Sequence, residues 1–429
     1  MAGPRANYHE PDLPAARPWD TFSRTRLLNP RLDTLQTYPF QKLATLVAGI
    51  PERSDLPRVN LSIGEPRHAT PALIGEALTA GLGSLSNYPS TQGPASLRQA
   101  IADWAQRRYD LPALEIGTQV IPVNGSREAL FAIAQAVVSP PVAGGPRPVV
   151  ISPNPFYQIY EGAALLAGAE PYYLNTVGAN GYVPDLSSVP ADVWARTQLF
   201  YICSPGNPTG AVLGLDFWRE LFDLADRYGF VVASDECYSE IYFDEASPPL
   251  GALQAAQTLG RGDYRNLLVF GSLSKRSNAP GLRSGYVIGG AALIKKFLLY
   301  RTYHGCAMSE AVAAASVAAW RDEAHVRENR ALYRAKFDAL LPILGPITGV
   351  QRPDAGFYLW LPTPVDDETF VKTLLAEENV LLLPGSYLAR QAHGLNPGAN
   401  HARIALVAPF EQCVEGAHRI ARHWQRLAR

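Results

Sequence analysis

The chain has 429 residues, with 38 Lys and Arg against 39 Asp and Glu and a formal net charge of −1. This balance, without any basic run, argues against a nucleic acid or an anionic membrane surface as a partner. No apolar stretch approaches the length that spans a bilayer, and the chain is long enough for two or three domains with large cores.

Residues 1–28 are polar and rich in proline, and they lack the apolar core of a secretory signal. We therefore treat them as an N-terminal extension and expect a cytoplasmic protein. The four cysteines are scattered without a Cys-x-x-Cys motif, and the eight histidines include no His-Glu-x-x-His motif. We expect neither disulfides nor a metal site.

Short apolar runs alternate with helical patterns over the middle of the chain, which predicts an α/β fold with a mostly parallel sheet covered on both faces. The clearest helix is Leu215 to Tyr228, with Gly229 placed to end it. Seven strands are expected, at residues 119–123, 148–152, 170–174, 198–203, 230–234, 267–270 and 285–288.

The C-terminal part changes character, because helical patterns surround three shorter strand-like pieces there. Helices are expected at 323–341, 367–377 and 411–427, and strands at 356–361, 380–383 and 402–407. This pattern is typical of a smaller α+β domain. The proline-punctuated segment 29–63 is expected to pack with it, so the predicted division is a large domain of residues 64–292 and a small domain of residues 29–63 plus 293–429.

Ligands of open α/β sheets bind beyond the carboxyl ends of the strands, so the residues that follow each apolar run are the informative ones. Ser126 and Arg127 follow the first strand, where a glycine turn opens a helix whose free N–H groups suit a phosphate. The alternative is an ordinary helix start capped by Ser126. Asn207 lies in a Ser-Pro-Gly-Asn-Pro-Thr-Gly turn, and turn formation alone explains the prolines and glycines but not the asparagine.

Asp235 and Tyr238 follow the fifth strand, within Ser-Asp-Glu-Cys-Tyr. A carboxylate at this position is costly to bury without a cationic partner, and a protonated pyridine nitrogen is such a partner. Tyr238 would then donate to the phenolic oxygen of the same ring. The alternative for Asp235 is a helix N-cap.

Lys275 follows the sixth strand in Ser272-Leu273-Ser274-Lys275, and Arg283 arrives eight residues later. An amine beside hydroxyls and a guanidinium suits a Schiff base to a phosphorylated aldehyde such as pyridoxal phosphate. A lone lysine is more often a solvated surface residue. However, four strand ends that converge on one edge favour a common ligand.

Together with Arg403 in His-Ala-Arg-Ile-Ala-Leu-Val, these motifs resemble those of the class I and II aminotransferases, which are fold-type-I pyridoxal phosphate enzymes. The resemblance covers about residue 29 to the C-terminus. It implies that Lys275 forms the Schiff base with the cofactor and moves the substrate proton. It also implies that Asp235 pairs the pyridinium nitrogen and that Asn207 and Tyr238 contact the phenolic oxygen.

The resemblance assigns further residues to the cofactor. Tyr157 would stack on the pyridine ring, although from the residues alone a core tyrosine is the natural interpretation. Ser126, Arg127, Ser272, Ser274 and Arg283 would surround the phosphate. Tyr88 is similar to a tyrosine that family members extend into the neighbouring subunit, which implies a homodimer with shared active sites.

Three residues would contact the substrate, an amino acid or a 2-oxo acid. Arg403 looks like the residue that binds the α-carboxylate through two parallel hydrogen bonds, and the apolar residues after it favour a buried strand over an exposed edge. Gly64 lies in a Gly-Glu-Pro loop where a glycine lets the backbone approach the ligand. Asn207 would take part here as well.

The chain departs from the common family pattern with Arg67-His68 after Gly-Glu-Pro and with Arg276-Ser277-Asn278 after Lys275. These and other segments resemble the bacterial N-succinyldiaminopimelate aminotransferases, so we expect glutamate to donate its amino group to the keto form of that substrate. At least one of Arg67, Arg127 and Arg276 is expected to bind a distal carboxylate.

Several other activities would use nearly the same residues. The alternatives are an aspartate, aromatic or kynurenine aminotransferase and a carbon–sulfur lyase. Some transcription regulators carry an aminotransferase-like domain, but they need a DNA-binding module, and 28 proline-rich residues are too short for a helix-turn-helix.

Overall fold

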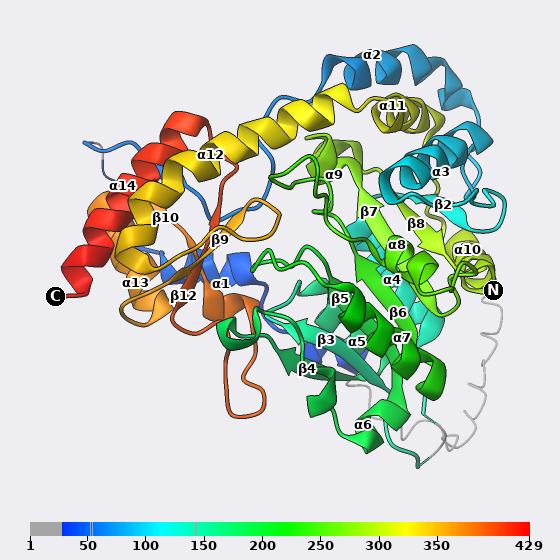
Figure 1. Ribbon diagram of the computed structural model, residues 1–429, viewed down its shortest axis with the longest axis horizontal. Helices are drawn as coiled ribbons and strands as arrows, with labels where there is room; N and C mark the ends of the chain where they lie inside the picture. The colour runs from blue at the N-terminus through cyan, green and yellow to red at the C-terminus, as the bar shows by residue number, and fades with distance from the viewer. Residues whose placement is uncertain (1–27, 52, 54, 142–143) are drawn as a thin grey trace, which may run out of the picture.

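The computed structural model describes residues 28–51, 53, 55–141 and 144–429, so the predicted extension lies outside the described residues apart from Leu28. A seven-stranded sheet with the order β2-β8-β7-β6-β5-β3-β4 forms its centre (Figure 1). All seven predicted strands are confirmed, as β2 (Val120–Val123), β3 (Val149–Asn154), β4 (Glu170–Asn175), β5 (Thr197–Cys203), β6 (Val231–Asp235), β7 (Leu267–Ser272) and β8 (Gly285–Gly289).

The sheet is mostly parallel, as predicted, because only β8 runs antiparallel to its two neighbours, β2 and β7. Alternate residues of each strand enter opposite cores: Leu267 and Val269 lie in one core, and Leu268 and Phe270 lie in the other. Helices cover both faces, as expected for such strands. The predicted helix is confirmed as α7 (Leu215–Tyr228), which ends at Gly229 with φ +75°.

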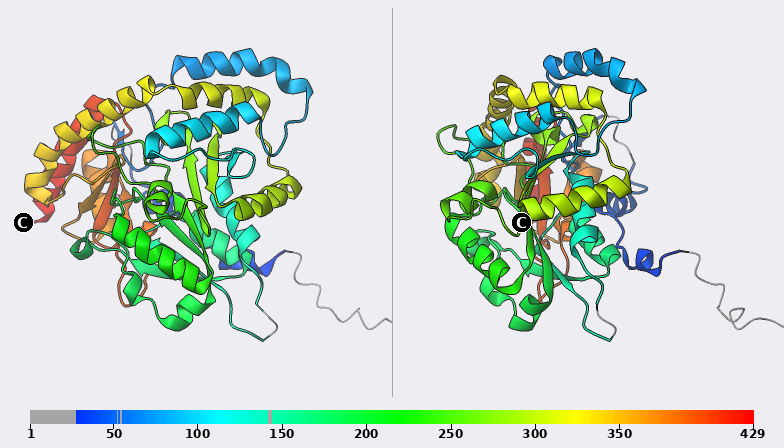
Figure 2. Two further views of the ribbon diagram at one scale, coloured as in Figure 1. Left: turned by 45° about the vertical axis from the view of Figure 1, so that its right-hand side comes forward. Right: turned by 90° about the vertical axis from the view of Figure 1, so that its right-hand side faces the viewer.

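The two faces carry different helices (Figures 1 and 2). On one face lie α4 (Ser126–Val137), α5 (Ile159–Ala167) and α10 (Ala291–His304). On the other face lie α2 (Ala72–Ala80), α3 (Ala95–Tyr109), α6 (Ala191–Arg196), α7, α8 (Ala252–Thr258) and α11 (Glu310–Arg321).

A separate hydrophobic core lies beside the carboxyl ends of the sheet and takes residues from both chain ends, including Leu43 and Val59. It contains the antiparallel sheet β11-β12-β9 and the parallel pair β1-β10. Its strands are β1 (Val59–Asn60), β9 (Tyr358–Pro362), β10 (Val380–Leu381), β11 (Leu383–Pro384) and β12 (His401–Ala405), and its helices are α1 (Pro39–Leu46), α12 (Ala324–Thr348), α13 (Asp367–Glu378) and α14 (Phe410–Leu427).

Two sequence expectations for this part were wrong in detail. The predicted helix 323–341 continues through Pro342 and Pro346 to Thr348, because Leu344 and Thr348 are buried and packing outweighs the cost of the prolines. The predicted strand 380–383 is divided, because β10 pairs with β1 whereas β11 pairs with β12. Leu381 and Leu383, two positions apart, thus belong to two different sheets.

The predicted domain division stays a prediction, and the packing bears on where its boundary lies. Helix α10 packs on β8 and α4, and α11 packs on α2 and α3. Both helices follow residue 290 and belong to the cores of the large sheet. We therefore propose that the boundary lies near the start of α12 and not at residue 293.

Within the described residues, no helix is long and apolar enough to cross a membrane, and no group of three or more His, Cys, Asp or Glu side chains is arranged to hold a metal ion. The cytoplasmic location and the lack of a metal stay predictions.

Candidate active site

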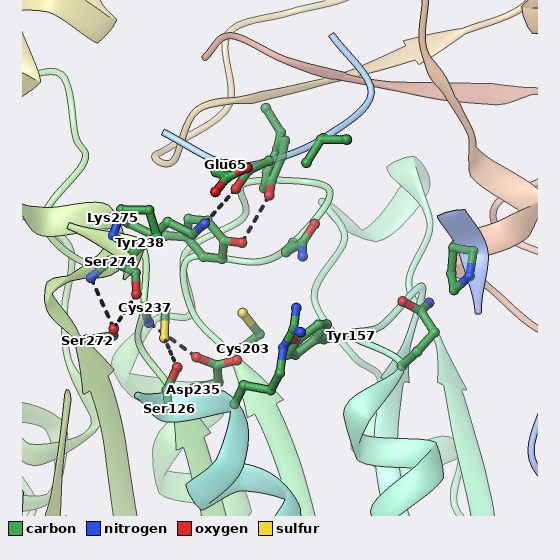
Figure 3. Close-up of a pocket in the computed structure, with 18 of the residues that line it drawn as sticks. Glu65, Ser126, Tyr157, Cys203, Asp235, Cys237, Tyr238, Ser272, Ser274 and Lys275 are labelled. Carbon is green, nitrogen blue, oxygen red and sulfur yellow. Dashed lines mark hydrogen bonds between the residues drawn. The ribbon is translucent and has the colours of Figure 1, made fainter. Parts of the chain in front are cut away.

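A cavity of about 510 Å³ lies where the carboxyl ends of the sheet strands face the second core (Figure 3). Thirteen residues were assigned from the sequence to catalysis, the cofactor or the reacting end of the substrate. Twelve of them line the cavity, namely Gly64, Ser126, Arg127, Tyr157, Asn207, Asp235, Tyr238, Ser272, Ser274, Lys275, Arg283 and Arg403. Tyr88 does not line it, and its side chain is fully exposed. The roles of these residues stay predictions.

Lys275 is positioned by the end of β7 and by the short helix α9 (Leu273–Arg276). Ser272 caps α9, because its hydroxyl accepts a hydrogen bond of 3.1 Å from the N–H of Ser274. The Lys275 ammonium donates to the Gly64 carbonyl at 2.5 Å. Burial lowers the pKa of Lys275 to about 8, so the amine lies near the point where it becomes neutral and nucleophilic.

Asp235 is the last residue of β6 and is 4% exposed. One carboxylate oxygen accepts from the Tyr160 hydroxyl at 2.7 Å, and the other accepts from the N–H of Cys237 at 3.3 Å. Burial raises the pKa of Asp235. Among the described residues no lysine or arginine forms an ion pair with it, so the site suits a cationic group supplied by a ligand.

One corner of the cavity suits an anion. Ser126 begins α4, directly after Gly125 with φ +86°, and Ser272 and Ser274 present hydroxyls 2.8 Å apart. The Arg283 guanidinium lies so close to Gly125 that a side chain there would collide with it. Serine hydroxyls, a guanidinium and the positive end of a 12-residue helix are the groups that bind phosphate esters.

Arg403 reaches the cavity from β12 and is 4% exposed. Its guanidinium donates to the Asn207 side-chain oxygen at 3.1 Å and to the Ser62 carbonyl at 2.9 Å, and its Nε has no partner within the part of the chain that the structure describes. It lies 4.5 Å from the centre of the Tyr358 ring. No carboxylate of the described residues pairs with Arg403, so a buried cation is available to an anionic ligand.

Tyr157 lies beside Arg127, whose Nε donates to the tyrosine hydroxyl at 2.5 Å. The Tyr157 ring meets the Tyr160 ring edge to face, with centroids 5.8 Å apart. Only Nε of Arg127 is used in this bond, so the two Nη groups of the guanidinium and the backbone N–H can still donate to an anionic ligand.

Sequence reasoning missed several residues in and next to the cavity. Tyr160 does not line the cavity but donates to Asp235 from the start of α5, and its position three residues after Tyr157 is the only local signal for it. Tyr358 bonds the Tyr238 hydroxyl at 3.0 Å across 120 residues of sequence, so no local pattern indicates it. The other missed lining residues include Tyr38, Phe40, Glu65, Cys203 and Cys237.

Of the three arginines proposed to bind a distal carboxylate, Arg276 was a wrong choice. It is 2% exposed, it pairs with Glu323 and it donates to the Ala319 carbonyl at 2.8 Å. Its guanidinium also lies 4.8 Å from the Trp320 ring, outside the cavity. Arg67 is exposed and does not line the cavity either, which leaves Arg127.

Comparison with known proteins assigns the family. The family model "Aminotransferase class I and II" matches residues 57–420. This chain is a class I/II aminotransferase. An LL-diaminopimelate aminotransferase of Nitratidesulfovibrio vulgaris is 32% identical over 399 residues, which are 91% of this chain and 98% of that protein.

Solved structures of other aminotransferases resemble this one. The crystal structure of an aminotransferase from Neisseria meningitidis is 51% identical, with a TM-score of 0.89, and the match covers 92% of this chain and 100% of that chain. A probable N-succinyldiaminopimelate aminotransferase from Thermus thermophilus is 25% identical, with a TM-score of 0.79, over 90% of this chain and 99% of that chain.

The aminotransferase is thus an enzyme that uses pyridoxal phosphate and acts on amino and 2-oxo acids. The cavity fits this cofactor. It offers an amine for the aldehyde, a buried carboxylate without a cationic partner for the ring nitrogen, and a hydroxyl-rich corner at a helix N-terminus for the phosphate ester.

Proposed function

We propose that this aminotransferase transfers an amino group between glutamate and a substrate with the diaminopimelate carbon skeleton. The observation that carries the proposal is the distribution of charge in the cavity. Among the described residues the buried Arg403 has no anionic partner, while the exposed side chains of Arg127 and Glu65 line the same cavity. A substrate with a carboxylate at one end and charged groups at the other matches this arrangement.

The relatives named above support this substrate class, since one acts on LL-diaminopimelate and another is titled a probable N-succinyldiaminopimelate aminotransferase. Both substrates carry a distal carboxylate that Arg127 would meet. Only the free form also carries a distal ammonium, and Glu65 would meet that group. The succinylated substrate expected from the sequence stays a prediction.

The residues of the cavity then take the following roles. Pyridoxal phosphate, when bound, supplies an acceptor for the electrons of the substrate Cα–H bond. Arg403 binds the α-carboxylate and so orients the Cα proton, which the Lys275 amine removes and returns. Asp235 keeps the ring nitrogen protonated, because its own buried charge needs that cation. Ser126, Ser272, Ser274 and Arg283 hold the phosphate, and Asn207, Tyr238 and Tyr157 contact the ring.

We also propose that the enzyme acts as a homodimer with shared active sites. Tyr88 is fully exposed, and Leu85 and Tyr303 are 67% and 88% exposed. Large exposed apolar side chains are typical of a surface that a partner covers where they lie together in one patch. A Tyr88→Ala protein that stays dimeric but binds the cofactor as tightly as the wild type would contradict the assignment of Tyr88.

The decisive experiment is a panel of amino donors and oxo-acid acceptors on the purified holoenzyme. It includes free LL-diaminopimelate, the N-succinyl form, aspartate, an aromatic amino acid and kynurenine, each with 2-oxoglutarate. We expect the highest kcat/KM with one of the two diaminopimelate forms. Highest turnover of another donor would contradict the proposal, and release of ammonia and pyruvate from cystathionine without an oxo acid would identify a carbon–sulfur lyase.

Two variants separate the two diaminopimelate forms. Arg127→Ala should weaken both, because both present the distal carboxylate. Glu65→Gln should raise the KM of the free form several-fold and leave the succinylated form unchanged, because only the free form has the distal ammonium. Equal effects of Glu65→Gln on both substrates would exclude this role of Glu65.

A further inference from the structure

A chain of buried polar contacts connects the long helix α12 to the backbone of Lys275. The Asn329 side-chain NH₂ donates to the carbonyls of Lys275 at 3.1 Å and of Arg276 at 3.4 Å. Asn329 is 2% exposed. Helix α9 has only four residues, so its last carbonyls lack partners within the helix and need an outside donor. Asn329 supplies that donor.

The orientation of the Asn329 amide is fixed by its surroundings. Because its NH₂ faces two carbonyls, its oxygen must be the acceptor on the other side, where it receives the Asn278 side-chain NH₂ at 3.0 Å and faces His68 Nδ1 at 2.9 Å. His68 therefore carries its proton on Nδ1. Its Nε2 is left to accept from the Lys336 ammonium, 2.7 Å away.

Lys336 is a buried cation, and apolar packing alone does not explain why a lysine occupies this position. It is 2% exposed, it donates to His68 and to the Leu406 carbonyl at 3.0 Å, and no carboxylate of the described residues pairs with it. Such a group is costly to bury. Burial also lowers the pKa of both Lys336 and His68, which keeps His68 neutral at neutral pH and able to accept the hydrogen bond.

The contacts join three parts of the active site. Asn329, Tyr333 and Lys336 are spaced four and three residues apart on one face of α12, and the Tyr333 ring packs on His68 at 4.6 Å. Leu406 follows the strand that carries Arg403. His68 follows the Gly64 loop by four residues, and Gly64 itself accepts from the Lys275 ammonium. In Figure 1, α12 extends from the second core toward the large sheet.

We propose that Asn329, held in place by His68 and Lys336, is a positioning residue for Lys275. The catalytic lysine is then tied to the 64–68 segment at its carbonyl, through Asn329 and His68, and also at its ammonium, through Gly64, while its amine is free. Proton transfer depends on placement of the amine to within fractions of an ångström, so the loss of one tie should lower the rate of proton transfer more than it weakens substrate binding.

The test uses substitutions at His68 in the full-length holoenzyme. His68→Phe keeps a ring against Tyr333 but removes both hydrogen bonds, whereas His68→Gln retains a donor and an acceptor. Asn329→Ala removes the donor to Lys275 directly. Leu332→Ala, on the exposed side of the same helix, is the matched control. Circular dichroism and the melting temperature establish that each protein is folded.

Two readouts are measured. The first is the pH midpoint of the visible absorption of the bound cofactor without substrate, and the second is kcat and KM of the half-reaction with glutamate. We expect Asn329→Ala and His68→Phe to lower kcat about tenfold or more, with KM changed about twofold at most, because misplaced catalytic groups cost rate before affinity. The pH midpoint should shift by about half a unit or more. His68→Gln should restore most of both.

An unchanged pH midpoint in folded His68→Phe would overturn the proposal, and so would a loss that His68→Gln fails to restore. If Asn329→Ala does not fold, the two His68 variants decide the matter. The first readout needs no substrate, so a negative answer there is independent of whether glutamate is the amino donor.

Discussion

The two sides of the cavity differ in how directly the sequence indicates them. On the sheet side, each chemical group comes at the end of its own strand: Asn207 after β5, Asp235 at the end of β6 and Lys275 after β7. On the side of the second core, the contacts join residues far apart in sequence, such as Tyr238 with Tyr358 and Asn329 with Lys275. We propose that the sheet side supplies the reactive groups and that the other side orients them.

If the two sides have these separate roles, substitutions on the sheet side should remove chemistry and cost several orders of magnitude in rate. Substitutions on the side of the second core should change affinity or alignment and cost less.

The largest effect is expected from Lys275→Ala. The protein should lose amino transfer by at least about a thousandfold, because it loses both the nucleophile and the proton carrier. The half-reaction with glutamate measures this, with Lys295→Ala on the exposed surface of α10 as the control. A Lys275→Ala protein with wild-type turnover would refute the assignment of the site.

Asp235→Asn is expected to rank next, with a loss in kcat of about a hundredfold or more. Asparagine retains the shape and still accepts from Tyr160, but it carries no charge to keep a ring nitrogen protonated. Steady-state kinetics of this variant should be compared with those of Asp223→Asn, an exposed residue of α7. If the two variants behave alike, Asp235 is not the partner of the ring.

Site residues could be predicted best where they directly follow an apolar strand in the sequence. Asp235 could be predicted because a carboxylate at the end of a strand buried on both faces has no solvent to stabilise it. Arg276 could not be placed, because its neighbour Lys275 faces the cavity and nothing in the spacing shows that the next side chain turns toward Glu323.

Helix and strand boundaries are likewise hard to predict where they depend on residues far away in the sequence. The seven strands of the large sheet follow from short apolar runs, but the end of α12 depends on the burial of Leu344 and Thr348 against other segments. The division of residues 380–384 between two sheets depends on β1, more than 300 residues away. A pattern read over a short stretch of sequence does not show which distant segment a helix or strand will pack or pair with.

Arg403→Lys is the first prediction for the side of the second core. Lysine keeps the charge but loses the forked donor, so the KM of amino and 2-oxo acids should rise about tenfold to a hundredfold, as loss of a charged hydrogen bond of about 1.5–3 kcal/mol implies. Cofactor affinity should stay within about twofold. Separate titrations with pyridoxal phosphate and with substrate check this, and a change in cofactor affinity alone would contradict the assignment.

The pH dependence of cofactor capture is expected to show a smaller effect. The Lys275 amine must be neutral to react, and its pKa is about 8, so the rate at which the apoenzyme captures pyridoxal phosphate should rise with pH and level off above about pH 8. Burial is the main cause, and the Arg403 guanidinium lowers this pKa further. Arg403→Ala should therefore move the midpoint upward, and a downward shift would exclude this electrostatic coupling.

The smallest effect is expected from Tyr358→Phe, which removes one buried hydrogen bond to Tyr238 and should cost about 0.5–1.5 kcal/mol, a few-fold change in kcat/KM. Gly64→Ala should cost more, because the new methyl group would collide with the Tyr358 hydroxyl. The double variant should lose less than the sum of the two, since phenylalanine removes the closest contact. Strict additivity would mean that the Gly64 loop does not rest on Tyr358.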